Sequence, residues 1–304
     1  MAEMLVKLFS KEIQSNLFPN NEFYKSSQLD GGVNINAKTV DIPQAGAKPT
    51  IIKNPTSFPL TIGSRTDDVL TYSVDHFVTA PTAIQDVNEM VISYSKRASV
   101  LQDHAKVLNS RVADEIAVAW SPTLAAQLSR TTGSASGSAL APSATGTRLA
   151  LTRDDIALIA TKFDRDDVPV SERNILFDAD LYAQLLKIDS FINFDYINRK
   201  PTVDGQIGEI FGMKVFKRSR AVLYTNAGTP VKKAVGATGA VTDNLAALAW
   251  ASGEVRRAEG IAKIYSDLDN PAFVGSVFNA AVRSGGTFAR ADQKGVYSLI
   301  QANS

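Results

Sequence analysis

One long amphipathic segment, from Ile84 to Trp120, constrains the fold of this chain more than any other feature. Its apolar residues recur every three or four positions, which is the spacing of one buried stripe along an α-helix. The members of the stripe are Ile84, Val87, Val91, Tyr94, Ala98, Leu101, Ala105, Leu108, Val112 and Ile116. A helix of about 35 residues would be roughly 50 Å long, several times the usual globular length. We therefore expect a structural spine around which the other parts of the chain are arranged.

The composition is that of a globular protein with a hydrophobic core. Of the 304 residues, 44% are hydrophobic and 21% are charged, which suits one large domain or two smaller ones. The formal net charge is only +1, whereas a dedicated nucleic-acid-binding protein is usually strongly basic. The chain has no cysteine, so disulfides, thiolate metal sites and a cysteine nucleophile are excluded. The fold must depend on packing or on assembly.

The N-terminal segment predicts an arm rather than a targeting signal. Charged residues, among them Glu3, Lys7 and Lys11, interrupt its apolar residues, so neither a secretory signal nor a membrane span fits. We expect synthesis in the cytoplasm and no membrane association. Residues 1–18 have mostly helical spacing and are followed by Pro19, which predicts a short docking helix.

The segment from Val33 to Val78 predicts an extended flap of β-structure, because it is rich in Val, Ile, Thr and Pro. Its candidate strands are residues 39–42, 50–52, 60–62 and 72–78. A two-stranded ribbon of this kind is marginally stable in water unless it lies against another surface.

After the spine, the sequence predicts a mixture of helices and strands. Residues 131–147, rich in Gly, Ser, Ala and Thr, are expected to form an exposed loop or linker. Thr152 can cap a helix with Asp154 and Asp155 in its first turn, which suits the helix dipole. The further elements that we expect are a buried strand at 174–177, a helix opened by Asp178 or Asp180, a strand at 212–216, a helix at 245–250, a hydrated helix end at 254–257, and strands at 261–265 and 296–300.

No motif for catalysis or cofactor binding is present: the chain has no GxGxxG, Walker phosphate loop, HExxH or GxSxG. The two histidines, His76 and His104, are expected to be structural. Asp164, Asp166 and Asp167 carry oxygens that suit a hard cation, but they lack the calcium-loop spacing. We interpret them as a solvated turn. We therefore expect a protein that is not an enzyme, with no catalytic, cofactor-binding or metal-binding residues and no cofactor.

The order of these parts resembles the major capsid proteins of tailed bacteriophages with the Hong Kong 97 type fold. Residues 164–177 with the following helix at 180–186 resemble a signature of the peripheral domain, and residues 208–216 resemble the GxxxGxxV segment. Residues 248–258 resemble a later segment of the axial domain. The resemblance implies an α+β fold divided into an N-terminal arm at 1–32, an extended β flap (E-loop) at 33–80, a spine helix and peripheral (P) domain at 81–205, and an axial (A) domain with return strands to the peripheral domain at 206–304.

By this resemblance, the chain is expected to be a structural coat protein of the virion, made in the host cytoplasm. It would assemble into hexamers and pentamers of an icosahedral head that encloses double-stranded DNA. The implied partners are further copies of the chain, packaged DNA through weak non-specific contact, and scaffold, portal and decoration proteins. Some relatives crosslink a flap lysine to an asparagine of a neighbour; Lys48 and Lys53 lie in the flap here, but no acceptor is assigned.

Two other classes of protein remain as alternatives. An encapsulin-like nanocompartment shell would share the fold but enclose protein cargo. A soluble α/β enzyme or binding protein would instead form a small oligomer with a deep polar pocket.

Overall fold

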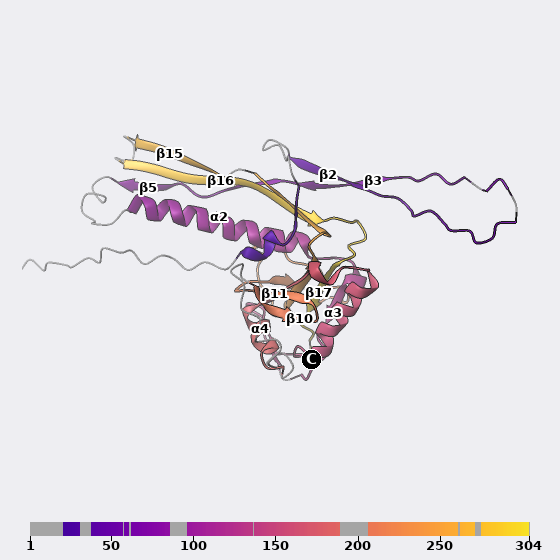
Figure 1. The fold of residues 1–304 in the computed structure, drawn as a ribbon. Coiled ribbons are helices and arrows are strands. Elements are labelled where there is room, and N and C mark those ends of the chain that lie inside the picture. Colours follow the sequence, from indigo (N-terminus) through magenta and orange to yellow (C-terminus); the bar gives the residue numbers. More distant parts are fainter. Residues whose placement is uncertain are drawn as a thin grey trace, which may run out of the picture.

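The computed structural model describes residues 21–30, 38–56, 58–60, 62–85, 96–135, 137–188, 206–260, 262–270 and 275–303. It shows a mixed α and β fold with two main parts (Figure 1). In the upper part of the view, a long helix lies along an elongated sheet, and a hairpin extends to one side. The lower part is compact and is built around a second sheet. The docking helix predicted at 1–18 lies outside the described residues.

The long helix, α2, covers Lys96–Trp120 and has 25 residues, so it is about 37 Å long. The predicted start at Ile84 is wrong, because Ile84 lies in the strand β5, Thr82–Gln85, where its side chain is buried against the sheet. An isoleucine at the end of a strand continued the helical spacing by coincidence, and spacing alone cannot show where one element ends. Residues 86–95 are outside the described part. Of the predicted stripe, Leu108, Val112 and Ile116 are buried, whereas Ala98 and Ala105 are exposed.

The sheet beside α2 is organised by the 14-residue strand β16, Gly275–Phe288. Along one side of β16 run β15, Lys263–Asn270, and β14, Val255–Glu259. Along the other side run β4, Asp75–Val78, and β5. The short strand β1, Gln28–Leu29, adds to β14 in parallel. The helix α2 lies along this sheet (Figure 1), and apolar residues of α2, β4 and β16 pack in one core.

The second sheet has the strand order β10-β11-β9-β13-β17-β6, with β12 also paired to β13. Its strands are β10 (Gln206–Ile210), β11 (Met213–Arg218), β9 (Arg173–Asp178), β13 (Asn244–Ala251), β17 (Val296–Ile300), β6 (Leu128–Arg130) and β12 (Val222–Tyr224). The strands predicted near 174–177, 212–216 and 296–300 are thereby confirmed.

The helix predicted at 245–250 is wrong, because these residues form the central strand β13. Every residue of β13 is buried, and the strand pairs with β9 on one side and β17 on the other. A strand covered on both faces is apolar at consecutive positions, so it lacks the alternation that identifies a strand. Leucine and alanine are also good helix formers. Residues 254–257, expected as a helix end, instead lie in the turn after β13 and in β14.

Successive residues of β9 and β13 point to opposite faces of this sheet and enter two different cores. On one face, Phe177 and its neighbours pack against α3, Arg153–Arg165, and α4, Ala179–Leu185. On the other face, Trp250 packs with Trp120 at the end of α2. The sheet therefore joins α2 to the compact part of the molecule.

Both predicted helix starts in this region are confirmed. Thr152 and Asp155 form a capping box at the start of α3, and Asp178 caps α4 by accepting a hydrogen bond from the backbone N–H of Asp180. Within the described ranges, the remaining short helices are the 3₁₀ turns η1 (Glu22–Lys25), η2 (Ala125–Gln127) and η3 (Val170–Glu172).

Residues 131–147 are mostly exposed, as predicted for a loop, but they are not a free linker. Thr131 and Ala141 are buried, and the strand β7, Gly137–Ser138, pairs with β8, Thr147–Arg148. Small residues allow this segment to pack closely on the compact part, where the side-chain amide of Gln301 donates to the carbonyl of Ser138.

The flap is a hairpin of β2, Thr39–Gln44, and β3, Asp68–Ser73, paired over six residues each. The strand predicted at 50–52 is not formed, and the described residues of 60–62 also lie outside any strand. Extended segments without a pairing partner do not form a ladder, whatever their β propensity. The predicted strand at 72–78 is divided at Val74 into β3 and β4. In the tail, the strand expected at 261–265 is observed as β15, and residue 261 lies outside the described part.

Candidate functional site

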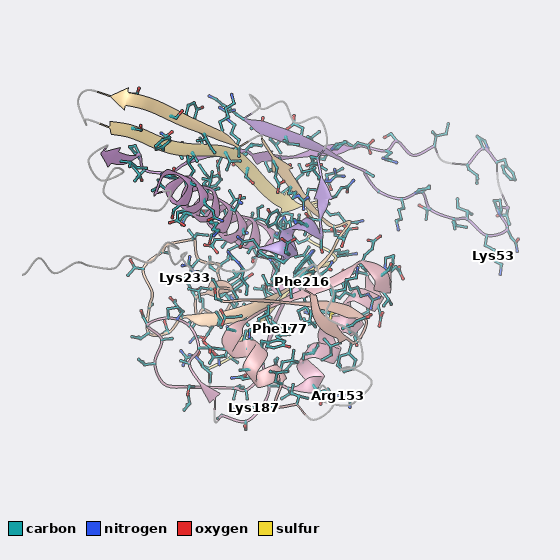
Figure 2. The ribbon with its side chains drawn as sticks, turned by 60° about the vertical axis from the view of Figure 1, so that its left-hand side comes forward. Lys53, Arg153, Phe177, Lys187, Phe216 and Lys233 are labelled. Atoms are coloured by element: carbon teal, nitrogen blue, oxygen red, sulfur yellow. The ribbon has the colours of Figure 1, made fainter. Side chains whose placement is uncertain are left out.

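Among the large apolar residues of the described chain, those with the highest exposed fractions lie on the loop between β2 and β3. We call this loop, residues 45–66, the flap tip; residues 57 and 61 of it are not described. Ile51 is 94% exposed, Phe58 75% and Ile62 95%. The flap tip extends far from the rest of the molecule (Figure 1), and Lys53 lies at its outer end (Figure 2). Exposed apolar groups gathered on a projecting loop are typical of a surface that contacts another molecule.

The flap tip is also basic. It carries Lys48, Lys53 and Arg65, and the sequence has no Asp or Glu between residues 45 and 66. The guanidinium of Arg65 lies 2.5 Å from Asp67, whereas the ammonium groups of Lys48 and Lys53 have no ion pair within the described residues. A partner surface with free carboxylates would complement this charge.

The flap base, by contrast, is held firmly to the sheet beside α2. The Tyr72 hydroxyl donates a hydrogen bond to Asp30, at 2.5 Å, and Asp30 also pairs with Arg256 of β14, at 2.6 Å. Burial and the adjacent Asp30 carboxylate raise the pKa of Tyr72. Ile42 and Tyr72 are buried together with Ala258. The structure therefore combines an anchored base with an exposed tip, as a docking arm requires.

A buried ion pair joins α2 to the second sheet. Arg218, at the end of β11, lies 2.5 Å from Asp114 of α2, and its side chain is 1% exposed. Burial lowers the pKa of Arg218, and the nearby Asp114 acts in the opposite direction. The Arg218 guanidinium also donates to the carbonyl of Ser110 and to the side chain of Asn21. The pair thus ties together α2, β11 and the first described residue of the chain.

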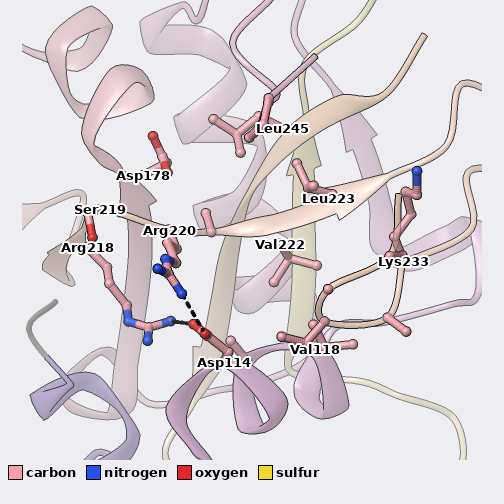
Figure 3. Close-up of a pocket in the computed structure, with 17 residues that line it drawn as sticks. Asp114, Val118, Asp178, Arg218, Ser219, Arg220, Val222, Leu223, Lys233 and Leu245 are labelled. Carbon is pink, nitrogen blue, oxygen red and sulfur yellow. Dashed lines mark hydrogen bonds and ion pairs between the residues drawn. The ribbon is translucent and has the colours of Figure 1, made fainter. Parts of the chain in front are cut away.

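Beside this ion pair is a cavity of about 260 Å³ (Figure 3). Its walls are mostly apolar, with contributions from Val118, Val222 and Leu245. Asp178 also lines it, and burial raises the pKa of this carboxyl. Asp178 already caps α4, and Asp114 already binds Arg218 and Arg220. These carboxylates therefore have structural roles, and the cavity holds no arrangement of nucleophile and base.

The C-terminus of α2 is capped by a lysine from elsewhere in the chain. The Lys232 ammonium donates to the carbonyls of Val118, Ala119 and Ser121, at distances of 2.8 to 3.2 Å. The last carbonyls of a helix lack their usual intrahelical donors, although Val118 here also accepts from the backbone N–H of Ser121, and a cation is favourable at this end. Burial lowers the pKa of Lys232 to about 8.

The two histidines and the aspartates singled out in the sequence do not form a common site. His76 is exposed on β4, whereas His104 of α2 is buried, with its Nδ1 2.8 Å from the Thr79 hydroxyl. Asp164 pairs with Arg173 at 2.7 Å, while Asp166 accepts hydrogen bonds from the Gly295 N–H and the Tyr297 hydroxyl.

The described residues contain no group of three or more His, Cys, Asp or Glu residues that could hold a metal ion. Among the described helices, none is long and apolar enough to cross a membrane.

Comparison with known proteins identifies the fold. No protein-family model matches the sequence, and no curated protein matches it. Solved structures match over nearly the whole chain. The capsid structure of the cyanophage P-SCSP1u has a TM-score of 0.71 and 18% identity, covering 99% of this chain and 94% of that chain. The capsid of a native GTA particle has a TM-score of 0.67 and 10% identity, covering 99% and 96%. A structure of Mycobacterium phage Che8 has a TM-score of 0.63 and 13% identity, covering 98% of each chain.

The chain has a phage capsid fold. This fold agrees with the resemblance drawn from the order of the sequence segments.

Sequence reasoning located the flap but missed the contacts that hold this phage capsid fold together. Asp30, Asp114 and Arg218 were not singled out, although each makes a buried or half-buried ion pair. The available signal was a charged residue at an inward position. Arg218 ends the strand β11 at a buried position, and Asp114 lies between Val112 and Ile116 on the buried side of α2. Such positions usually indicate a paired charge.

Proposed function

We propose that this chain is the major capsid protein of a tailed bacteriophage, a structural protein that assembles with copies of itself into the shell of the virion. The observation that carries the proposal is the flap tip, which exposes Ile51, Phe58 and Ile62 far from any surface of the described chain that could cover them. A loop with this exposure gains stability when it lies on a neighbouring copy. The match to capsid structures over nearly the full chain supports the same conclusion.

In this proposal, copies of the chain form hexamers and pentamers of an icosahedral head that encloses double-stranded DNA. The near-zero net charge suits a shell of many copies, because a large charge of one sign would cause the copies to repel one another. Contact with DNA is weak and non-specific, and scaffold, portal and decoration proteins are the further partners. The named structural neighbours are coats of phage and GTA particles, which favours a virion coat over an encapsulin-like shell or a soluble enzyme.

The parts of the molecule take their roles from this proposal. We assign the β2–β3 hairpin as the E-loop and α2 as the spine helix. The layer of α2 and the sheet around β16 serves as the peripheral domain, and the compact part around β9 and β13 as the axial domain. This assignment is spatial. In this proposal, residues 128–178 belong with the axial part and β14–β16 with the peripheral part, whereas the division at residue 205 stays a prediction from the sequence.

The test is the size of the purified protein. We expect rings or shells of megadalton mass by size-exclusion chromatography and electron microscopy, with nucleic acid as the content of particles taken from an infected host. A monodisperse monomer at high protein concentration would contradict the proposal. Particles filled with protein cargo would favour the encapsulin-like alternative.

A further inference from the structure

A second, smaller cavity lies at the flap base, where β3, β4, β16 and α2 meet. Its volume is about 160 Å³, and its charged lining residues are Asp75 of β4 and Glu115 of α2. Lysine, arginine and histidine are absent from the lining residues. Glu115 has a partner in Arg111, at 2.6 Å, whereas the Asp75 carboxylate has no hydrogen bond or ion pair within the described chain. The cavity therefore carries a negative charge that the subunit itself does not fully neutralise.

An unsatisfied hydroxyl indicates that the cavity is built for a polar guest. Ser284 lines the cavity and is only 2% exposed, and its Oγ has no hydrogen-bond partner in the structure. Buried polar atoms without a partner are rare and cost free energy. A donor entering the cavity would satisfy Ser284 and face Asp75, which lies opposite it in the β4–β16 pairing.

Two glycines beside the cavity let β16 lie close to the flap base and to α2. A Cβ on Gly285 would lie 2.3 Å from the backbone oxygen of Ser73, and a Cβ on Gly286 would lie 3.1 Å from the indole nitrogen of Trp120. Side chains at these positions would force the strand away from the flap base or from α2, so this close packing depends on glycine.

We propose that this cavity receives the ammonium group of Lys53 from the flap tip of a second copy of the chain; this pairing rests on the proposed capsid function. Lys53 is free of ion pairs in the described chain and lies at the outer end of the hairpin, far from its own flap base (Figure 2). An ammonium supplies three donors, enough for the Asp75 carboxylate and the Ser284 hydroxyl together. The exposed Ile51 and Ile52 beside Lys53 then lie against the same neighbour.

Charge reversal tests the pairing. Lys53→Glu should place a carboxylate against Asp75 and Glu115, and Asp75→Lys should place two ammonium groups together, so each variant should raise the protein concentration needed for assembly by about tenfold or more. The double variant restores opposite charges and should return this concentration to within about threefold of wild type. Lys48→Glu, the same change elsewhere on the flap tip, is the matched control, and Asp75→Lys should not rescue any defect that it has. Circular dichroism of each unassembled variant checks that the subunit is folded.

The outcomes separate the pairing from the function on which it rests. Single variants that assemble like wild type, or a double variant that is no better than the singles, would overturn the pairing while leaving the coat function intact. Rescue of Lys48→Glu by Asp75→Lys would also overturn it, because the effect would then come from overall charge. A wild-type chain that never assembles would overturn both.

Discussion

Among single residues, Arg218 shows most clearly how one charge can organise this fold. Its guanidinium is buried, yet it finds a carboxylate on α2, a carbonyl of the same helix and the side chain of Asn21. Taking both charges out of water is costly, so the pair is worth little as a net source of stability. Its effect is to set how α2 and β11 lie against each other, because no other position satisfies all these groups.

We predict that Asp114→Ala lowers the free energy of unfolding by about 3–5 kcal/mol, since it leaves the Arg218 charge buried and unpaired. Urea denaturation of the unassembled protein measures this change. As a control, Arg65→Ala removes an exposed ion pair and should have a much smaller effect, because solvent screens the two charges. Equal effects of the two substitutions would show that the burial of the pair has no energetic consequence.

Lys232 should make stability depend on pH. Its pKa is about 8 in the folded chain and about 10.4 when exposed. Between these values the unfolded chain binds more protons at this residue, so its contribution to stability should increase from pH 8 to pH 10. Above about pH 10, tyrosines whose pKa is raised by burial, such as Tyr24 and Tyr224, act in the opposite direction.

The measurement compares the wild type with Lys232→Met at pH 7, 8, 9 and 10. The substitution should cost about 1–3 kcal/mol by leaving carbonyls at the end of α2 without a donor, and this difference should grow as the pH rises through the window. Lys294→Met, at an exposed lysine, is the control for the change in net charge. A difference between wild type and Lys232→Met that shrinks with rising pH would contradict the assigned direction.

Among the elements, α2 has two unequal faces. Ile116 is 1% exposed and belongs to the core shared with the second sheet, whereas Val107 is 50% exposed. Replacing either Ile116 or Val107 with alanine removes only methyl and methylene groups from the same helix. The pair of positions therefore separates the effect of burial from that of helix propensity.

We expect Ile116→Ala to lower the free energy of unfolding by about 2–4 kcal/mol, because it leaves a cavity between α2 and the sheet. Val107→Ala should be neutral or slightly stabilising, because alanine is the better helix former at an exposed position. Thermal and urea denaturation of the unassembled protein check both values. A large loss for Val107→Ala would mean that this face of α2 is also covered.

At the scale of the whole molecule, the flap tip and the two cores are independent of each other. The hairpin is held by β2–β3 pairing and by the contacts of Tyr72 and Ile42 at its base, none of which involves the flap tip. Replacing residues 45–67 with Asn-Gly, a two-residue sequence that favours a tight hairpin turn and joins Gln44 to its partner Asp68, should leave the thermal midpoint of the subunit within a few degrees of wild type.

Assembly, however, should be lost, because the surface that we propose to lie on a neighbouring copy is gone. Size-exclusion chromatography should show a folded monomer or small oligomer. A variant that still forms normal particles would show that the flap tip is dispensable and would remove the main support for its role in docking.

The sequence by itself determined those elements whose identifying residues lie within a few positions of one another. The capping box of Thr152 and Asp155, the cap at Asp178 and the stripe of Leu108, Val112 and Ile116 depend on residues within a few positions of one another. Only the tertiary structure decided that 245–250 is a strand, since β9 and β17 supply its pairing and cover. It also decided the pairing of Arg218 with Asp114, because contacts between residues distant in the chain exist only after the chain has folded around its two cores.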